Sequence, residues 1–136
     1  MSLRVTALDP FRRAIEAGAK LVMVSNAAYP ALDNAGTPAV FSRAIVTGLL
    51  RGTFGFQGLV VSDALDAPAP AHTPHAPARA LAAGVDLLLF TSGSAAHAAY
   101  EELRRDVQAS PALRAQLDRA VARIRALEAW LGRGCR

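Results

Sequence analysis

Three short apolar runs, separated by stretches with helical spacing, constrain the fold of this sequence more than any other feature. The runs occupy residues 20–25, 59–63 and 85–91, and each is too short to be a helix. Apolar strands that alternate with amphipathic helices are typical of a parallel sheet with right-handed crossover connections. We therefore predict an α/β fold in which one helix is followed by three strand–helix units and one additional helix.

Capping residues and helical periodicity place the helices between these strands. The first is expected to start with Asp9 as its cap and Pro10 as its first residue, and to end at Gly18. The others are expected from residue 42 to about 52, from 73 to 84, from 92 to about 107, and from 110 to 132. Prolines and turn formers predict irregular loops over residues 26–38 and 66–75, each leaving the C-terminal end of a strand.

Composition indicates one globular domain and argues against two classes of partner. The chain has 136 residues, of which 52% are hydrophobic and 19% charged. Its net charge of +4 comes from arginines that are dispersed, with few aromatic side chains among them to stack bases, so we expect no nucleic-acid partner. No apolar run approaches the length of a membrane span, and the first residues lack the layout of a signal peptide. As written, the chain is expected to be cytoplasmic without a membrane partner, and export of a longer parent stays open.

Asp63 is the strongest candidate for a functional residue. A glycine-rich turn at residues 55–58 leads into the apolar run that ends at Ser62 and Asp63, which is the pattern of a buried parallel strand with an acid at its C-terminal rim. Such a carboxylate suits a nucleophile or a general base, and a turn-capping role is about equally compatible with its position. Asp66 could line a pocket in the same loop, although a hydrogen bond to the turn is the favoured reading. Asp86 precedes its strand at the opposite rim and is read as structural.

The histidines and the single cysteine give no comparable signal. His72 and His75 lie in the proline-rich loop without a third ligand nearby, and His97 is expected on the exposed side of a helix, so no metal site is predicted. Cys135 has no partner cysteine. Neither a phosphate-binding glycine loop nor a serine-hydrolase elbow occurs, which removes nucleotide-binding and serine-hydrolase readings.

Several stretches together resemble glycoside hydrolase family 3, most closely its β-N-acetylglucosaminidase branch. Their order and spacing hold from about residue 9 to residue 132, so we interpret residues 1–8 as a leader or the end of a preceding element, 9–132 as the C-terminal portion of the family's barrel, and 133–136 as a tail. The matching stretches are Pro10-Phe11-Arg12, Val22-Met23-Val24-Ser25, Tyr29-Pro30-Ala31-Leu32-Asp33, Leu49-Leu50-Arg51, Gly55-Phe56-Gln57-Gly58, Val60-Val61-Ser62-Asp63-Ala64-Leu65 and Ala82-Ala83-Gly84-Val85-Asp86.

The resemblance implies a fold and an activity. The fold would be a partial (β/α)8 TIM barrel, because a complete one needs eight strands and about 250 residues. Asp63 occupies the position of the family's catalytic nucleophile, which implies retaining hydrolysis of β-linked N-acetylglucosamine units, such as peptidoglycan fragments, with no metal or organic cofactor. The family's acid/base is a histidine on a loop upstream of the matched region, and none of the three histidines here takes that place. Asn26 stands where many relatives have a histidine, so it is a weaker candidate for a sugar contact, as is Asp66.

A second hypothesis belongs to a different class. Three strands leave sheet edges unpaired and barrel-interior surface exposed, which favours self-association or pairing with a missing barrel half. The chain would then be a catalytically inactive module that acts only through that association. A flavodoxin-like binding domain has the same alternation but needs more strands and a phosphate loop.

Overall fold

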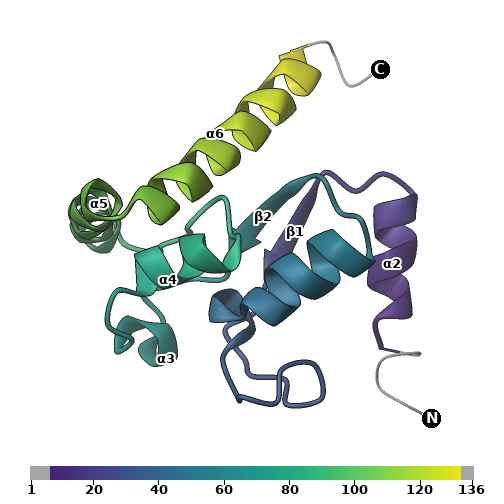
Figure 1. Cartoon of the computed structure of the whole chain (residues 1–136), viewed down its shortest axis with the longest axis horizontal. Coiled ribbons are helices and arrows are strands. Elements are labelled where there is room, and N and C mark those ends of the chain that lie inside the picture. The colour runs from purple at the N-terminus through teal and green to yellow at the C-terminus, as the bar shows by residue number, and fades with distance from the viewer. Residues whose placement is uncertain (1–6, 133–136) are drawn as a thin grey trace.

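The computed structural model describes residues 7–132, and its elements follow the expected alternation (Figure 1). The first six residues of the expected leader and the whole expected tail lie outside the described residues. The elements are α2 (Asp9–Glu16), β1 (Leu21–Val24), the 3-10 helix η1 (Ala39–Phe41), the π-helix η2 (Ala44–Thr53), β2 (Leu59–Ser62), α3 (Pro68–Ala71), α4 (Ala76–Ala83), α5 (Gly93–Ala109) and α6 (Pro111–Gly132).

The sheet contains two parallel strands and a third segment that pairs at one point. β1 and β2 run in register from Leu21 opposite Leu59 to Val24 opposite Ser62. The strand expected over residues 85–91 is reduced to a bridge between Val61 and Leu87. One hydrogen bond explains why this strand is so short. The N–H of Leu89 donates to the Ser62 hydroxyl at 2.8 Å instead of to a backbone carbonyl of β2. A side chain therefore takes a place that the ladder would otherwise occupy.

Three helix boundaries or types differ from the sequence expectation. Asp9 lies inside α2 rather than at its cap, and its carboxylate pairs with Arg12 and Arg13 one turn later. A short helix, α3, forms in the loop expected to be irregular, because its prolines occupy the first turn, where their missing N–H groups cost nothing. The helix expected from residue 73 starts later, at α4, with His75 as its N-cap.

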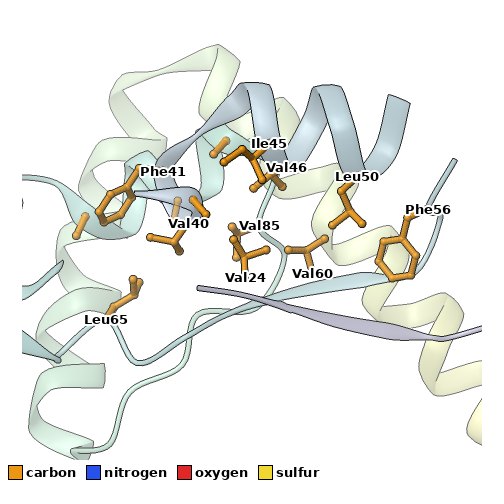
Figure 2. Packing of buried hydrophobic residues seen from close by; sticks show 14 residues of the cluster. Val24, Val40, Phe41, Ile45, Val46, Leu50, Phe56, Val60, Leu65 and Val85 are labelled. Atoms are coloured by element: carbon orange, nitrogen blue, oxygen red, sulfur yellow. The ribbon is translucent and has the colours of Figure 1, made fainter. Parts of the chain in front are cut away.

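The main core fills the space between one face of the sheet and the helices η1, η2 and α4. Val24 and Val60 project from β1 and β2 toward Val46 and Leu50 of η2, as Figure 2 shows. Other members of this cluster include Val40, Phe41, Ile45, Phe56, Leu65 and Val85. Leu81, Val107 and Ala120 form a second, smaller cluster that joins α4, α5 and α6.

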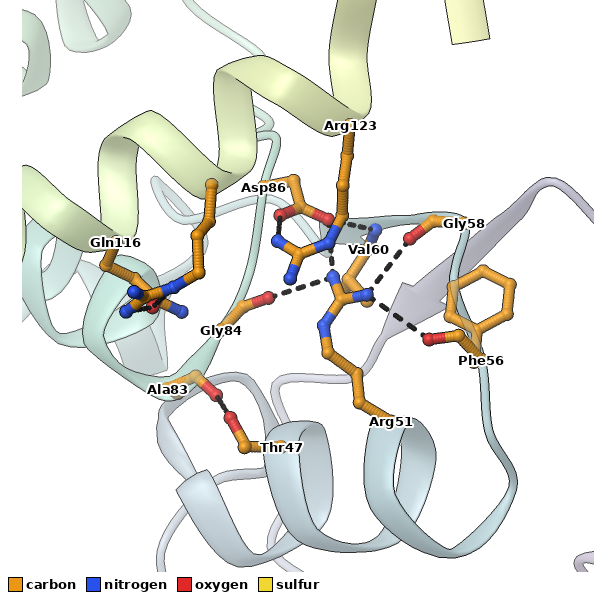
Figure 3. Close-up of polar contacts among 11 residues, drawn as sticks. Thr47, Arg51, Phe56, Gly58, Val60, Ala83, Gly84, Asp86, Gln116 and Arg123 are labelled. Carbon is orange, nitrogen blue, oxygen red and sulfur yellow. Dashed lines mark hydrogen bonds and ion pairs between the residues drawn. The ribbon is translucent and has the colours of Figure 1, made fainter. Parts of the chain in front are cut away.

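A buried ion network fastens η2, the third segment and α6 together at the N-terminal rim of the strands (Figure 3). The side chain of Asp86 is 1% exposed and accepts hydrogen bonds from Arg51 at 2.5 Å, from Arg123 at 2.9 Å and from the Val60 N–H at 2.9 Å. Arg51 also donates to the carbonyl oxygen of Gly84 and, by its other terminal nitrogen, to that of Gly58. Burial lowers the pKa of the Arg51 guanidinium, while Asp86 opposes this shift, and the group stays charged at neutral pH. The structural reading of Asp86 thus agrees with its contacts.

The opposite face of the sheet is open. Side chains alternate along a strand, so Leu21 and Met23 point away from the core that Val24 enters, and they are 46% and 53% exposed. Leu89 of the third segment is also exposed on the described part of the chain. Within residues 7–132, no helix has the length and apolar character needed to cross a bilayer. Leu21, Met23 and Leu89 thus form an apolar part of the open face, while other exposed apolar side chains, such as Tyr100 and Leu131, lie on helices.

Candidate active site

Asp63 lies at the C-terminal rim of the sheet, immediately after β2. Its N–H donates to the carbonyl of Val24 at 2.9 Å, so the parallel ladder continues one residue beyond the strand. By the alternation of side chains, Asp63 belongs to the same face as Val61, which is the open face. Its Oδ1 accepts the N–H of Ala64 at 2.7 Å, and among the described residues Oδ2 accepts no hydrogen bond. One carboxylate oxygen is thus held by the turn while the other is available to a ligand.

Asn26 is brought to the same rim by the end of β1. Its Nδ2 donates to the carbonyl of Ala64 at 2.9 Å, across 38 positions of sequence. Its Oδ1 is buried and has no partner among the described residues. The two predicted site residues Asn26 and Asp63 are therefore linked through one residue, Ala64, whose N–H donates to Asp63 and whose carbonyl accepts from Asn26. The free amide oxygen could accept a hydrogen bond from a ligand or from a preceding segment.

Asp66 is occupied by a different loop. Its carboxylate accepts the N–H and the hydroxyl of Thr91 at 2.9 Å and the N–H of Ser92 at 3.0 Å, just before α5 begins. The hydrogen bond from the Thr91 backbone is the main cause that holds the pKa of Asp66 below its usual range, although burial acts in the opposite direction. With these donors in place, the carboxylate fixes the exit of the third segment.

All three histidines are exposed to solvent, and one of them also contacts a carboxylate. His72 and His97 are exposed. His75 is also exposed, but its Nδ1 lies 2.9 Å from Oδ2 of Asp106 on α5. Neither His72, His75 nor His97 forms a hydrogen bond with Asp63 within the described chain. Among the described residues, the rim therefore offers one carboxylate, that of Asp63, with an oxygen free of hydrogen bonds.

Sequence reasoning missed two sets of contacts. Arg51 and Arg123 were not recognised as partners of Asp86, although an arginine amid the apolar spacing of the last helix is a detectable signal. Glu102 and Asp106 stand four apart on α5 and share one face, a spacing that could have marked them as partners for a cation.

Comparisons with known proteins agree with this geometry. Residues 1–127 match the glycosyl hydrolase family 3 N terminal domain. The chain is similar to a beta-N-acetylglucosaminidase/beta-glucosidase of Cellulomonas fimi, with 39% identity over 134 residues that cover 90% of this chain and 23% of the relative. It is also similar to a beta-hexosaminidase of Chromobacterium violaceum, with 45% identity over 86 residues covering 60% of this chain and 23% of the relative.

A solved structure supports the same assignment. The beta-N-acetylhexosaminidase of Beutenbergia cavernae superposes with a TM-score of 0.86 at 35% identity, covering 95% of this chain and 39% of that enzyme. The chain thus spans about a quarter of the curated relatives and two fifths of this structure. The predicted partial barrel is confirmed, and the chain belongs to glycosyl hydrolase family 3, of whose N-terminal domain it forms a part.

Proposed function

We propose that this chain contributes the nucleophile of a retaining glycosidase that acts on β-linked N-acetylglucosamine, and that Asp63 is this nucleophile. The observation that carries the proposal is the position of Asp63, at the C-terminal rim and on the open face, with Oδ2 free of hydrogen bonds among the described residues. The names of the relatives from Cellulomonas, Chromobacterium and Beutenbergia support the substrate class.

The proposed reaction assigns one bond-forming step to this chain. Oδ2 of Asp63 attacks the anomeric carbon while the bond to the leaving-group oxygen breaks, which gives a covalent glycosyl-enzyme. Water then hydrolyses this ester with net retention of configuration. Asn26 holds the carbonyl of Ala64, the residue after Asp63, and thereby helps to orient the carboxylate. The proton for the leaving group is supplied by a segment that precedes the matched region.

The test places this chain where its missing partners exist. Residues 7–132 replace the matching segment of the Beutenbergia enzyme, and hydrolysis of an aryl N-acetyl-β-glucosaminide is measured. We expect turnover from the chimera and a loss of at least about 10³-fold in kcat for Asp63→Asn, because the covalent step loses its nucleophile. Asp118→Asn is the matched control, since Asp118 is an exposed acid on α6 without an ion pair among the described residues. Turnover retained by Asp63→Asn in a folded chimera would contradict the assignment.

A second candidate function, assembly with the missing part of the barrel, is favoured by the open side of β1. An apolar cavity of about 370 Å³ lies beside this strand, lined by Phe11 of α2, Val22 and Met23 of β1 and Tyr29 of the following loop, among others. A right-handed connection through α2 would place the preceding parallel strand along the free edge of β1, under α2. We therefore infer that the occupant is the preceding part of a family 3 barrel, on the same or on another polypeptide.

This inference is tested with a separately produced N-terminal segment of the Beutenbergia enzyme, up to the point where the match begins. We expect a one-to-one complex in light scattering, weakened by Met23→Glu because a carboxylate would be buried in the interior of the barrel. Leu131→Glu is the control, since Leu131 is equally apolar and exposed but lies near the end of α6. A dimer of this chain alone, or a monomer that ignores the segment, would refute pairing with the missing half.

A further inference from the structure

A histidine and two carboxylates converge on the outer surface, where the start of α4 meets α5. His75 precedes α4, while Glu102 and Asp106 lie one turn apart on α5. Nδ1 of His75 is 2.9 Å from Oδ2 of Asp106 and 3.6 Å from Oε1 of Glu102. The donor atoms of all three residues lie within 4.8 Å of one another. These side chains bring one imidazole nitrogen and two carboxylates to a single point.

The two carboxylates have no arginine or lysine partner in the described chain, although arginines are abundant in the sequence. Other acids of the described residues do pair with arginine, for example Glu101 with Arg104 on the same helix. Arg79, one turn after His75, has its guanidinium over the ring of Phe41 instead. Like charges four apart on a helix repel each other, so the position between Glu102 and Asp106 favours a cation. His75 is the group that the fold directs there.

The spacing suits a transition-metal ion as well as a proton. Ligands at about 2.1 Å around a tetrahedral zinc ion lie about 3.4 Å from one another. The observed donor separations extend from 2.9 Å to at most 4.8 Å and therefore bracket that value. Small rotations of Glu102 and Asp106 would equalise them, since both are solvent-accessible side chains. The exposure of His75, 63% for its side chain, leaves the remaining coordination positions to water.

We propose that His75, Glu102 and Asp106 form a binding site for a divalent transition-metal ion such as zinc, and that this site does not include Asp63. An imidazole ligand favours zinc, cobalt or nickel over magnesium and calcium, which prefer oxygen ligands alone. The ion would join the residue before α4 to the middle of α5 and would stabilise the contact between these helices. The site needs no part of the missing barrel, and it is independent of the proposed glycosidase activity.

Protons compete with the metal for this site. The hydrogen bond and the charge of Asp106 are the main causes that raise the pKa of His75, with a further contribution from Glu102. The charged groups that face the imidazole are these two carboxylates of α5, and Arg79 is the cation nearest to it along α4. Because a metal ion binds the neutral imidazole, lowering the pH through the pKa of His75 must weaken metal binding.

Zinc chloride titrated into the chain by calorimetry at pH 7.5 tests the proposal. All proteins carry Cys135→Ser, because that cysteine lies outside the described residues and a thiolate binds zinc. We expect one ion per chain, at least tenfold weaker binding for His75→Asn and for Asp106→Asn, and weaker binding at pH 5.5. Asparagine is chosen at position 75 because the backbone there has the left-handed conformation, with φ of 53°, which asparagine tolerates.

A control and a second readout make the outcome decisive. His97→Ala removes an exposed histidine of α5 and is expected to leave the affinity unchanged. Cobalt chloride should give visible absorption bands that disappear with His75→Asn, and circular dichroism verifies that each variant is folded. Equal zinc affinity of His75→Asn and the parent, or absence of one-to-one binding in the folded parent, would overturn the proposal.

Discussion

Replacing Asp86 by asparagine is expected to be one of the most damaging single polar substitutions in this chain. The change keeps the size of the side chain but removes the charge that Arg51 and Arg123 share. It leaves two guanidinium groups beside each other at a site where the Asp86 side chain is 1% exposed. Asparagine can still accept the N–H of Val60, so the backbone contact is retained and the measured loss reports mainly on the ion pairs.

The magnitude follows from the burial of the partners. The side chain of Arg51 is 11% exposed and that of Arg123 is 24% exposed, so solvent screens these pairs only weakly. Removing one partner of a buried ion pair typically costs about 3–5 kcal/mol, because the other charge remains uncompensated. Arg123→Gln should cost less, about 1.5–3 kcal/mol, since Asp86 keeps Arg51 and the backbone donor. The predicted order of stability is therefore parent, Arg123→Gln, Asp86→Asn.

Urea denaturation followed by circular dichroism measures these losses. With a slope of about 2 kcal/mol/M, a loss of 4 kcal/mol moves the midpoint by about 2 M. Asp118→Asn removes an acid from the exposed face of α6 and should change the stability by less than about 0.5 kcal/mol. A loss below about 1 kcal/mol for Asp86→Asn, with an unchanged slope, would refute the argument that the network holds the three elements together.

Three further substitutions test other contacts. Gly58→Ala places a Cβ against the carbonyl oxygen of Lys20, just before β1, and 2.6 Å from the ring of Phe56. It should cost about 1–3 kcal/mol in urea unfolding, whereas a neutral result would mean that the turn can shift. Ser62→Ala leaves the N–H of Leu89 without its acceptor and should cost about 1–3 kcal/mol, with faster amide exchange at Leu89 as the local readout; unchanged exchange would contradict the role given to the hydroxyl. The folded-state pKa of Asp66 is depressed, so the stability that its carboxylate contributes is present above the unfolded-state pKa and is lost as pH falls through the folded-state pKa. Asp66→Asn should therefore be less stable than the parent near neutral pH, and its stability should fall less steeply in acid. An identical dependence of stability on pH in the two proteins would disprove this linkage.

The strands and most helices were predictable because their signals are local. The apolar runs that became β1 and β2 need only period and length to be recognised. The same reasoning overestimated the third strand, since the decisive event is a bond between Ser62 and Leu89, which are 27 positions apart. It also missed α3, because prolines that forbid a helix interior are tolerated in a first turn. Local rules thus identified the elements but not how completely each one pairs.

The candidate site also has some features that the sequence predicts and others that it does not. The position of Asp63 at a strand end was visible in sequence, and so was the parallel rim that brings Asn26 near it. The bond from Asn26 to Ala64 depends on the register of β1 against β2, which no local pattern specifies. The convergence of His75 with Asp106 also depends on how α4 and α5 cross, so it could be recognised only in three dimensions.

The hydrogen bond between Asn26 and the carbonyl of Ala64 would couple assembly of the barrel to the orientation of the proposed nucleophile. β1 is the strand with a free edge, and Asn26 is among the first residues to leave it. Any segment that docks on this edge would therefore also restrain Ala64, the residue that follows the proposed nucleophile. Completion of the barrel and alignment of Asp63 would then be thermodynamically linked. A partner that binds β1 more tightly would also narrow the range of orientations of the Asp63 carboxylate. Conversely, a ligand bound to Asp63 would raise the affinity of the chain for that partner.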